Sequence, residues 1–319
     1  DMLEFDINYH EAVQNRLQNT LNKDPDGRKH EILKKELLKR IQISPDKHFY
    51  SEMLLWLSIQ EKDFELALIQ AKSLDRRLSE DGERVFSLAK LCTSNNNYDV
   101  AADAYTYLIN QGEDNPYYLK SRVEFLNVKY LIITNSFNYK KEEISKLKND
   151  YISTIDEFGR NASTITLMRY LAHLQAFYLN ETDSAIVLLE ETIKIPNAPP
   201  SLKAECKLEL ADILLFTGNI WDATLLYSQV EKAFKSEPIG HEAKLRNAKL
   251  SYFIGEFEWA KAQLDVLKAA TSKLIANDAM DLSLLISDNI DLDSTTTALS
   301  IYSRAELLMY RNKDDLAMK

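Results

Sequence analysis

A short pattern that recurs along the chain is the strongest constraint on its fold. Six segments carry a polar or glycine turn, usually followed by an aromatic or aliphatic residue, with an alanine three positions later. These alanines are Ala12, Ala67, Ala101, Ala223, Ala260 and Ala317, and a looser seventh is Ala185. Ala67 and Ala101 stand 34 residues apart, and the steps from Ala185 to Ala223 and from there to Ala260 are 38 and 37 residues. Self-similarity at a period of roughly 20–50 residues indicates an array of stacked repeats.

Glycine and proline are too rare for a chain built of turns and sheets. Seven of each occur in 319 residues, so glycine makes up about 2% against a usual ~7%. Leu, Ala, Glu and Lys are abundant, and all four favour helices. The prolines fall between the apolar segments, where a helix would be interrupted. The composition therefore predicts an all-α protein.

The alanine pattern resembles the tetratricopeptide repeat (TPR) family, in a divergent bacterial form. The resemblance implies units of two antiparallel helices, A and B, stacked into a right-handed α-solenoid, with a small residue in helix A where helix B packs close. The residues twelve before the anchor alanines are Leu55, Ala89, His173, Ala211, Ala248 and Ala305, four of them alanine. The core residues four after the anchors are Ala71, Tyr105, Leu189, Tyr227 and Leu264. One such hairpin cannot bury its apolar face alone, so neighbouring repeats must stack.

Longer intervals between anchors predict extra, non-repeat helices. Ala12 and Ala67 are 55 residues apart, Ala260 and Ala317 are 57 apart, and each interval leaves room for one more helix. The predicted organisation is one continuous solenoid over residues 1–319, with a half-repeat (1–27), an extra helix (28–45), TPR-like repeats (46–115), a degenerate long repeat (116–158), TPR-like repeats (161–275), an extra helix (278–290) and an incomplete repeat (297–319). Both ends fall inside a repeat, so we expect a fragment of a longer array, with genuine half-repeats as the alternative.

No sequence motif points to catalysis or to a cofactor. GxxxxGK[ST], GxGxxG and GxSxG are all absent, and no histidine has a second His or Cys three or four residues on, as a helical metal site needs. Asp291–Thr295 matches the DxDxT of haloacid-dehalogenase-type phosphatases, but that chemistry needs a buried parallel strand, so a loop before the next helix is predicted. The acidic positions from Asp278 to Asp293 are expected to form a solvated helix face, with a cation or basic-peptide surface as the alternative. We expect no enzyme, no cofactor and no metal.

The charge of the chain limits its partners. A net charge of −10 argues against nucleic acid, which normally requires a basic stripe. No window of 18 uninterrupted apolar residues occurs, so no membrane span is expected. The loose, Asn-, Lys- and Ile-rich repeats look like those of bacterial envelope-associated TPR proteins. That resemblance favours a soluble protein of the periplasm or envelope over a cytoplasmic one.

The same resemblance implies a binding surface. In TPR arrays, certain positions of the A helices line a concave groove that binds a protein or peptide. Carried onto this sequence, the candidate groove-lining residues are Glu52, Trp56, Phe86, Lys90, Tyr170, Phe177, Leu208, Asp212, Lys249 and Tyr252. No A helix carries the Lys/Asn pair that grips a carboxylate in some family members. The expected function is a non-catalytic protein–protein interaction scaffold. The alternatives are an envelope receptor for a small ligand or glycan, and a sensor or regulatory region of a longer polypeptide.

Overall fold

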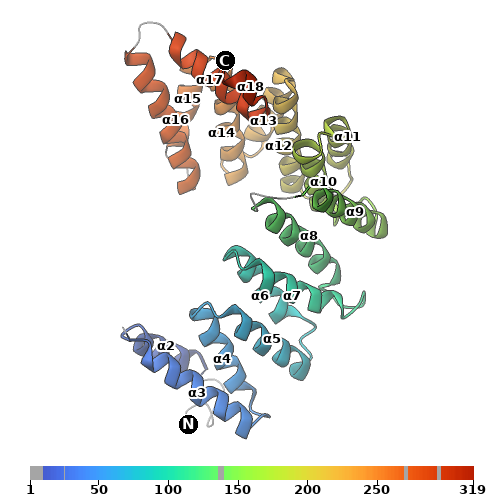
Figure 1. Cartoon of the computed structure of the whole chain (residues 1–319), viewed down its shortest axis with the longest axis vertical. Coiled ribbons are helices and arrows are strands. Elements are labelled where there is room, and N and C mark those ends of the chain that lie inside the picture. Colours follow the sequence, from blue (N-terminus) through green and yellow to red (C-terminus); the bar gives the residue numbers. More distant parts are fainter. Residues whose placement is uncertain (1–9, 25, 136–139, 269–271, 293–295) are drawn as a thin grey trace. The chain divides into compact units, whose positions relative to one another are not determined.

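The computed structural model describes residues 10–24, 26–135, 140–268, 272–292 and 296–319 (Figure 1). Over these ranges the chain forms helices and no strand, which confirms the all-α prediction. The chain divides into two compact units, Asp1–Tyr139 and Lys140–Lys319, here called unit 1 and unit 2. The division falls inside the segment predicted as a degenerate long repeat (116–158).

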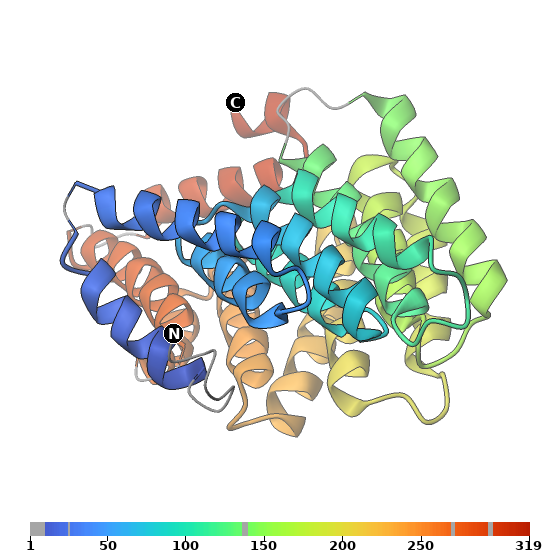
Figure 2. The ribbon, with the colours of Figure 1, turned by 90° about the horizontal axis from the view of Figure 1, so that it is seen from below.

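Unit 1 is a run of helices that pack in chain order. Its helices are α2 (His10–Leu21), α3 (Arg28–Ile43), α4 (His48–Gln60), α5 (Phe64–Leu78), α6 (Glu83–Ser94), α7 (Tyr98–Ile109) and α8 (Tyr118–Thr134). From α3 onward each helix packs against the next, and α5 also contacts α7 (Figure 2). The extra helix predicted after the first half-repeat is α3. One apolar core joins α2, α3 and α4, and a second joins α4 to α8.

Unit 2 repeats this arrangement. Its helices are α9 (Lys141–Phe158), α10 (Ile165–His173) continued by the π-helix η2 (Leu174–Tyr178), α11 (Thr182–Ile193), α12 (Pro200–Thr217), α13 (Ile220–Ala233), α14 (Pro238–Phe253), α15 (Phe257–Leu267), α16 (Lys273–Leu292), α17 (Thr297–Tyr310) and α18 (Asp314–Ala317). Helices α10, α12, α14 and α16 contact one another as well as their chain neighbours. They form the A layer of the unit, and α9, α11, α13 and α15 are the B helices. The second extra helix, α16, is longer than the predicted 278–290.

The anchor alanines lie where helices cross. Ala67, Ala101, Ala185, Ala223 and Ala260 have no exposed surface. The small residues twelve positions earlier that are fully buried are Ala89, Ala211 and Ala248. The core residues four positions later, Ala71, Tyr105, Leu189, Tyr227 and Leu264, are at most 1% exposed. Ala12 is exposed and Ala317 is half-buried. Side chains as small as alanine let two helix axes approach to about 8–10 Å, so these positions set the spacing of the stacked hairpins.

Polar residues at the turns define where the B helices begin. Asp63 accepts a hydrogen bond from the backbone N–H of Leu66, and Asn97 accepts one from that of Val100. Both side chains therefore cap a helix N-terminus, as their residue types favour. Gly218 ends α12 with φ of 105°, a left-handed conformation that costs glycine little. The residue types at these positions therefore account for the hairpin turns.

One repeat carries an extra residue. The π-helix η2 widens the end of α10, and a π-turn inserts a single residue into a helix. The buried small residue in this repeat is therefore Ala172, thirteen residues before Ala185, and not His173. The twelve-residue count was wrong here because it assumed an uninterrupted α-helix.

Candidate functional site

The A layer of unit 2 presents a polar surface that we call the A-helix face. It contains a cavity of about 330 Å³. The residues that line it come from α10, α12, α14 and α16, and they are Arg169, Glu205, Leu208, Glu209, Pro238, Ile239, Glu242, Arg246 and Ile275. Charges of both signs therefore meet on a surface formed by four consecutive A helices.

Ion pairs connect α10 to α12 across this face. Arg169 Nη2 lies 3.3 Å from Glu205 Oε2, and Arg169 Nη1 lies 3.6 Å from Glu209 Oε2. His173 Nδ1 lies 2.7 Å from Glu209 Oε1. Glu209 is only 8% exposed, so two cationic or polar partners compensate for the burial of its carboxylate. This network holds α10 and α12 together on the A-helix face.

A second network connects α12 to α13 and α14. Asp212 pairs with Arg246 and accepts a hydrogen bond from the Tyr227 hydroxyl, while Arg246 Nε donates to Glu242 Oε1 over 2.8 Å. Burial raises the pKa of the Asp212 carboxyl to about 6, against the opposing effects of Arg246 and Tyr227. Asp212 is therefore held ionised near neutral pH at a cost in stability.

This raised pKa predicts a pH dependence of stability. Between about pH 4 and pH 6 the folded protein binds more protons at Asp212 than the unfolded chain does, so the free energy of unfolding falls as pH rises through that window. Asp212→Asn mimics the protonated carboxyl. The free energy of unfolding of wild type minus that of Asp212→Asn should therefore decrease by about 2 kcal/mol from pH 4 to pH 7. The melting temperatures of the two proteins, measured across this range, would show the change. A difference that stays constant or grows with pH would contradict this assignment.

Helix α17 covers part of the A-helix face. It packs on α14 and α16, and Figure 1 shows it near the C-terminus, just before α18. Leu299, Ser303 and Leu307, spaced four residues apart, are its buried side chains. The Tyr252 hydroxyl on α14 donates to Glu306 Oε2 over 2.7 Å. The last turn of α17 thereby reaches toward α12.

Two donors at the end of α17 bind backbone carbonyls of α12. The Tyr310 hydroxyl donates to the carbonyl of Asp212 over 3.2 Å, and Arg311 Nε donates to the carbonyl of Leu215 over 3.0 Å. Because α12 ends at Thr217, the Arg311 cation stands close to the negative end of the helix dipole. These contacts join residues nearly one hundred positions apart.

Aromatic rings cluster at the C-terminal end of α17. Phe177 and Phe216 have ring centroids 5.2 Å apart, and Tyr310 lies 6.3 Å from Phe216 and 6.2 Å from Phe253. These distances are typical of edge-to-face and tilted aromatic pairs. The rings contact one another and do not line the 330 Å³ cavity.

The predicted groove residues of unit 1 lie on α4 and α6. Glu52 Oε1 is 3.7 Å from Arg84 Nη2, which connects the two helices. Trp56 is half-buried against the core of α2, α3 and α4, and Phe86 is half-buried beside two tyrosine rings. Lys90 is exposed. Whether these residues line a groove remains a prediction.

In unit 2 the predicted residues differ in exposure. Leu208 is 4% exposed and Tyr252 is 1% exposed, so both serve mainly as packing residues. Asp212 is partly buried in its ion pair, and Lys249 is exposed with its ammonium 5.7 Å from the Phe253 ring centroid. Asp212 and Tyr252 are also the positions that α17 contacts.

The extra residue of η2 shifts the positions on α10. Tyr170 and Phe177 were placed by the uninterrupted count. The ion pairs to α12 come from Arg169 and His173, and Phe177 contacts α12 through the Phe216 ring. The Arg169 guanidinium lies 4.7 Å above the Tyr170 ring, and Phe177 packs against His173 with ring centroids 4.8 Å apart. The sequence signal that could have revealed this shift is His173, which stands directly after Ala172 at the position expected for a small residue.

The described residues contain no group of three or more His, Cys, Asp or Glu side chains that could hold a metal ion. Cys92 and Cys206 are fully buried, and burial raises the pKa of their thiols to about 11 and about 12. Asp291 and Leu292, the first residues of the predicted DxDxT loop, form the end of α16, so the loop prediction is wrong there, and residues 293–295 lie outside the described ranges.

None of the helices in the described part of the chain is both long enough and apolar enough to cross a membrane.

The fold is similar to that of solved protein structures. No protein-family model matches the sequence, and no curated protein matches it. The crystal structure of a tetratricopeptide repeat protein from Parabacteroides merdae ATCC 43184 is similar at a TM-score of 0.43 and 13% sequence identity, covering 75% of this chain and 90% of that chain. The TPR-like character of the present chain rests on its own stacked helix pairs and buried anchor alanines.

Proposed function

We propose that the protein is a non-catalytic interaction scaffold whose A-helix face in unit 2 binds a helical segment of a partner protein. The observation that carries this proposal is α17, which lies on that face as a helix held by side-chain contacts. A helix laid in a groove is a recurring mode of peptide recognition, read through apolar residues one turn apart. Leu299, Ser303 and Leu307 have that spacing.

The contacts of α17 indicate the chemistry that the face accepts. The Glu306 carboxylate of α17 accepts a hydrogen bond from the Tyr252 hydroxyl. The Tyr310 hydroxyl and Arg311 of α17 donate hydrogen bonds to backbone carbonyls near the end of α12. Tyrosine and arginine are also the residue types that most often dominate binding energy at interfaces. A partner helix with Leu-x₃-Ser-x₃-Leu at the buried positions, and with Glu-x₃-Tyr-Arg starting one residue before the second leucine, would repeat the contacts of α17.

The remainder of the A-helix face offers room beyond α17. The 330 Å³ cavity presents Arg169 and Arg246 beside three glutamates. A partner segment with polar side chains of both signs would suit it, whereas nucleic acid would not, since the face is not basic. A bacterial periplasmic or envelope location, and a regulatory role within a longer polypeptide, remain predictions from the sequence.

A peptide of residues 296–312 tests this function. Fluorescently labelled, it is titrated into the full chain and into a Glu306→Ala/Tyr310→Ala variant, with binding followed by fluorescence anisotropy. In wild type the chain's own α17 competes at an effective concentration on the order of 1 mM. The double variant should therefore bind the peptide at least tenfold more tightly than wild type.

The matched control changes the opposite side of α17. Ile301 and Met309 are 67% and 59% exposed, so Ile301→Ala/Met309→Ala leaves the contacts to the A-helix face intact. That variant should bind the peptide as weakly as wild type does. Equal affinity for all three proteins, or no saturable binding to the Glu306→Ala/Tyr310→Ala variant, would refute the proposal.

A further inference from the structure

We infer that unit 2 holds a second binding site, which takes an aliphatic carboxylate in the form of a free fatty acid. The site is a pocket of about 520 Å³ bounded by the end of α11, the start of α12 and the end of α13, here called the α12 pocket. Most of its lining residues are apolar, and the others are two lysines and one glutamine. The residues used in the argument are Ile193, Lys203, Lys207, Gln229, Val230 and Phe234.

The lining of the α12 pocket carries positive charge and includes no acidic side chain. Lys203 and Lys207 stand one helical turn apart on α12, so their side chains share one face of the helix. Lys207 Nζ donates to Gln229 Oε1 over 2.9 Å, and neither lysine pairs with a carboxylate in the described part of the chain. Like charges at this spacing destabilise a helix. A bound anion would relieve that repulsion.

The position of Lys203 on its helix adds to this charge. Lys203 is the fourth residue of α12, which begins at Pro200, and the first turn of the helix has neither an acidic residue nor a side-chain cap. The N-terminal end of a helix carries a partial positive charge, so a cation there is unfavourable and an anion is stabilised. The start of α12 therefore favours a negative charge that no side chain of its first turn supplies.

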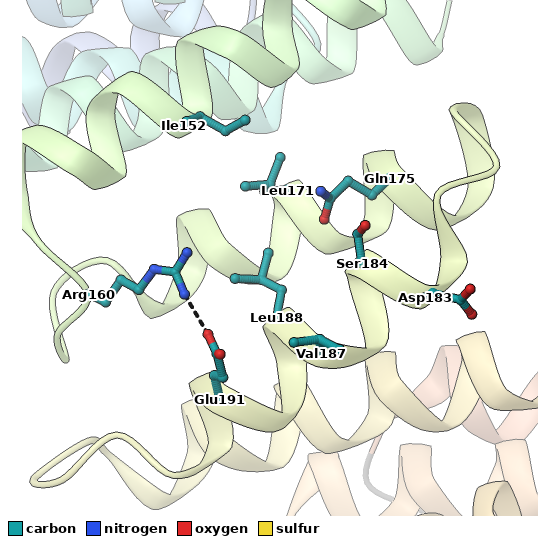
Figure 3. A pocket seen from close by; sticks show the side chains of 9 residues that line it. All are labelled: Ile152, Arg160, Leu171, Gln175, Asp183, Ser184, Val187, Leu188 and Glu191. Carbon is teal, nitrogen blue, oxygen red and sulfur yellow. Dashed lines mark hydrogen bonds and ion pairs between the residues drawn. The ribbon is translucent and has the colours of Figure 1, made fainter.

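Two other cavities of unit 2 differ from the α12 pocket in their charge. The cavity on the A-helix face has three glutamates beside its two arginines. A cavity between α9 and α11 is lined by Asp183 and Glu191, and its arginine, Arg160, already pairs with Glu191 (Figure 3). In both cavities the chain's own carboxylates compensate the cations, whereas the lysines of the α12 pocket are left for an anion from outside the chain.

The rest of the lining favours an apolar tail on that anion. Val230 is almost fully buried, and Ile193 and Phe234 are half-buried. Side chains with hydrogen-bonding groups are confined to the two lysines and Gln229. The peptide groups of a bound peptide would therefore lose water without gaining partners, so a hydrocarbon chain with one carboxylate fits better than a peptide C-terminus. A volume of 520 Å³ is within the usual range of about 300–1,000 Å³ for small-ligand sites.

Octanoate is the probe for this site, and its binding to the full chain is measured by isothermal titration calorimetry. Octanamide has the same tail without the charge, and acetate has the same charge without the tail. Octanoate should bind saturably, and each of the other two should bind about tenfold more weakly, because one lacks the ion pair and the other lacks the apolar contact. N-acetyl-leucine, a carboxylate with a peptide group, should also bind more weakly than octanoate. Tighter binding of N-acetyl-leucine would overturn the assignment to a fatty acid.

A pair of variants tests the role of the lysines. Lys203→Gln/Lys207→Gln should weaken octanoate binding about tenfold and leave octanamide binding unchanged, because only the carboxylate interacts with the two charges. Lys232 and Lys235 are exposed and close in sequence to Phe234, but they do not line the pocket. Lys232→Gln/Lys235→Gln makes the same change in net charge and should keep the wild-type affinity. Equal weakening by the two variants would contradict a specific site.

A second pair of variants locates the bound tail. Ala233 is an exposed lining residue, so Ala233→Trp fills the pocket and should abolish octanoate binding. Ala262 is exposed on α15, and Ala262→Trp should leave binding unchanged. Absence of saturable octanoate binding to wild type, or binding that survives Ala233→Trp, would overturn the inference. At about 100° per residue, the two lysines lie on the side of α12 opposite Glu205 and Glu209, so either result leaves the peptide test of the A-helix face unaffected.

Discussion

Replacing Ala260 with leucine should lower the free energy of unfolding by about 2–3 kcal/mol. Ala260 has no exposed surface and stands where α15 packs closely against α14. Three additional carbon atoms cannot fit there unless the helices move apart, and such overpacking costs about 1–3 kcal/mol. For a unit of this size, a loss of that magnitude corresponds to a fall of about 4–12 °C in melting temperature, measurable by circular dichroism.

The control for this prediction lies on the same helix. Ala262 is exposed, so Ala262→Leu makes the same chemical change without entering the core. Its melting temperature should stay within about 1 °C of wild type, because surface substitutions usually change stability by no more than about 0.5 kcal/mol. Equal effects of the two substitutions would show that the anchor alanines do not set the spacing of the helices.

Replacing Asp75 with alanine should destabilise unit 1 by about 3 kcal/mol. Asp75 is 4% exposed and accepts three hydrogen bonds. The donors are the backbone N–H of Gly82 at 2.7 Å, the Tyr107 hydroxyl at 2.8 Å and Gln111 Nε2 at 3.1 Å. These bonds join α5 to the start of α6 and to α7. Hydrogen bonds to a charged group contribute about 1.5–3 kcal/mol each, and the donors left behind are only partly rehydrated.

Thermal or urea unfolding of two variants distinguishes this role from a general effect of charge. Asp103 lies exposed on α7, and Asp103→Ala removes the same charge from unit 1. That variant should keep the wild-type midpoint, whereas Asp75→Ala should unfold at clearly lower urea concentration. A small effect of Asp75→Ala, similar to that of Asp103→Ala, would contradict the structural role of the network.

Much of the fold follows from local patterns in the sequence. The anchor alanines identify the helix crossings because close packing excludes larger side chains, and Ala101 and Ala223 are fully buried as expected. Asp63 and Asn97 mark helix starts because their side chains cap backbone N–H groups. Each of these features depends on residues less than one repeat apart, which is why a single sequence reveals them.

The candidate site depends on relations that no local pattern encodes. The π-turn at η2 shifts the helical count by one residue, and the ion pairs to α12 come from Arg169 and His173. A count that assumes regular helices cannot detect an inserted residue. The contact from Tyr310 to α12 spans nearly one hundred residues, so the docking of α17 could not be expected from spacing.

The most direct test of the account is to locate where a helix binds. A peptide of residues 296–312 that carries the photoreactive p-benzoylphenylalanine at the position of Tyr310 is irradiated with the Glu306→Ala/Tyr310→Ala chain, and the crosslinked residues are identified by mass spectrometry. Because Tyr310 contacts the carbonyl of Asp212 and the ring of Phe216, crosslinks should fall on α12 between those residues, with others on α14. Crosslinks confined to the B helices or to unit 1 would contradict the claim that the A-helix face of unit 2 binds a helix.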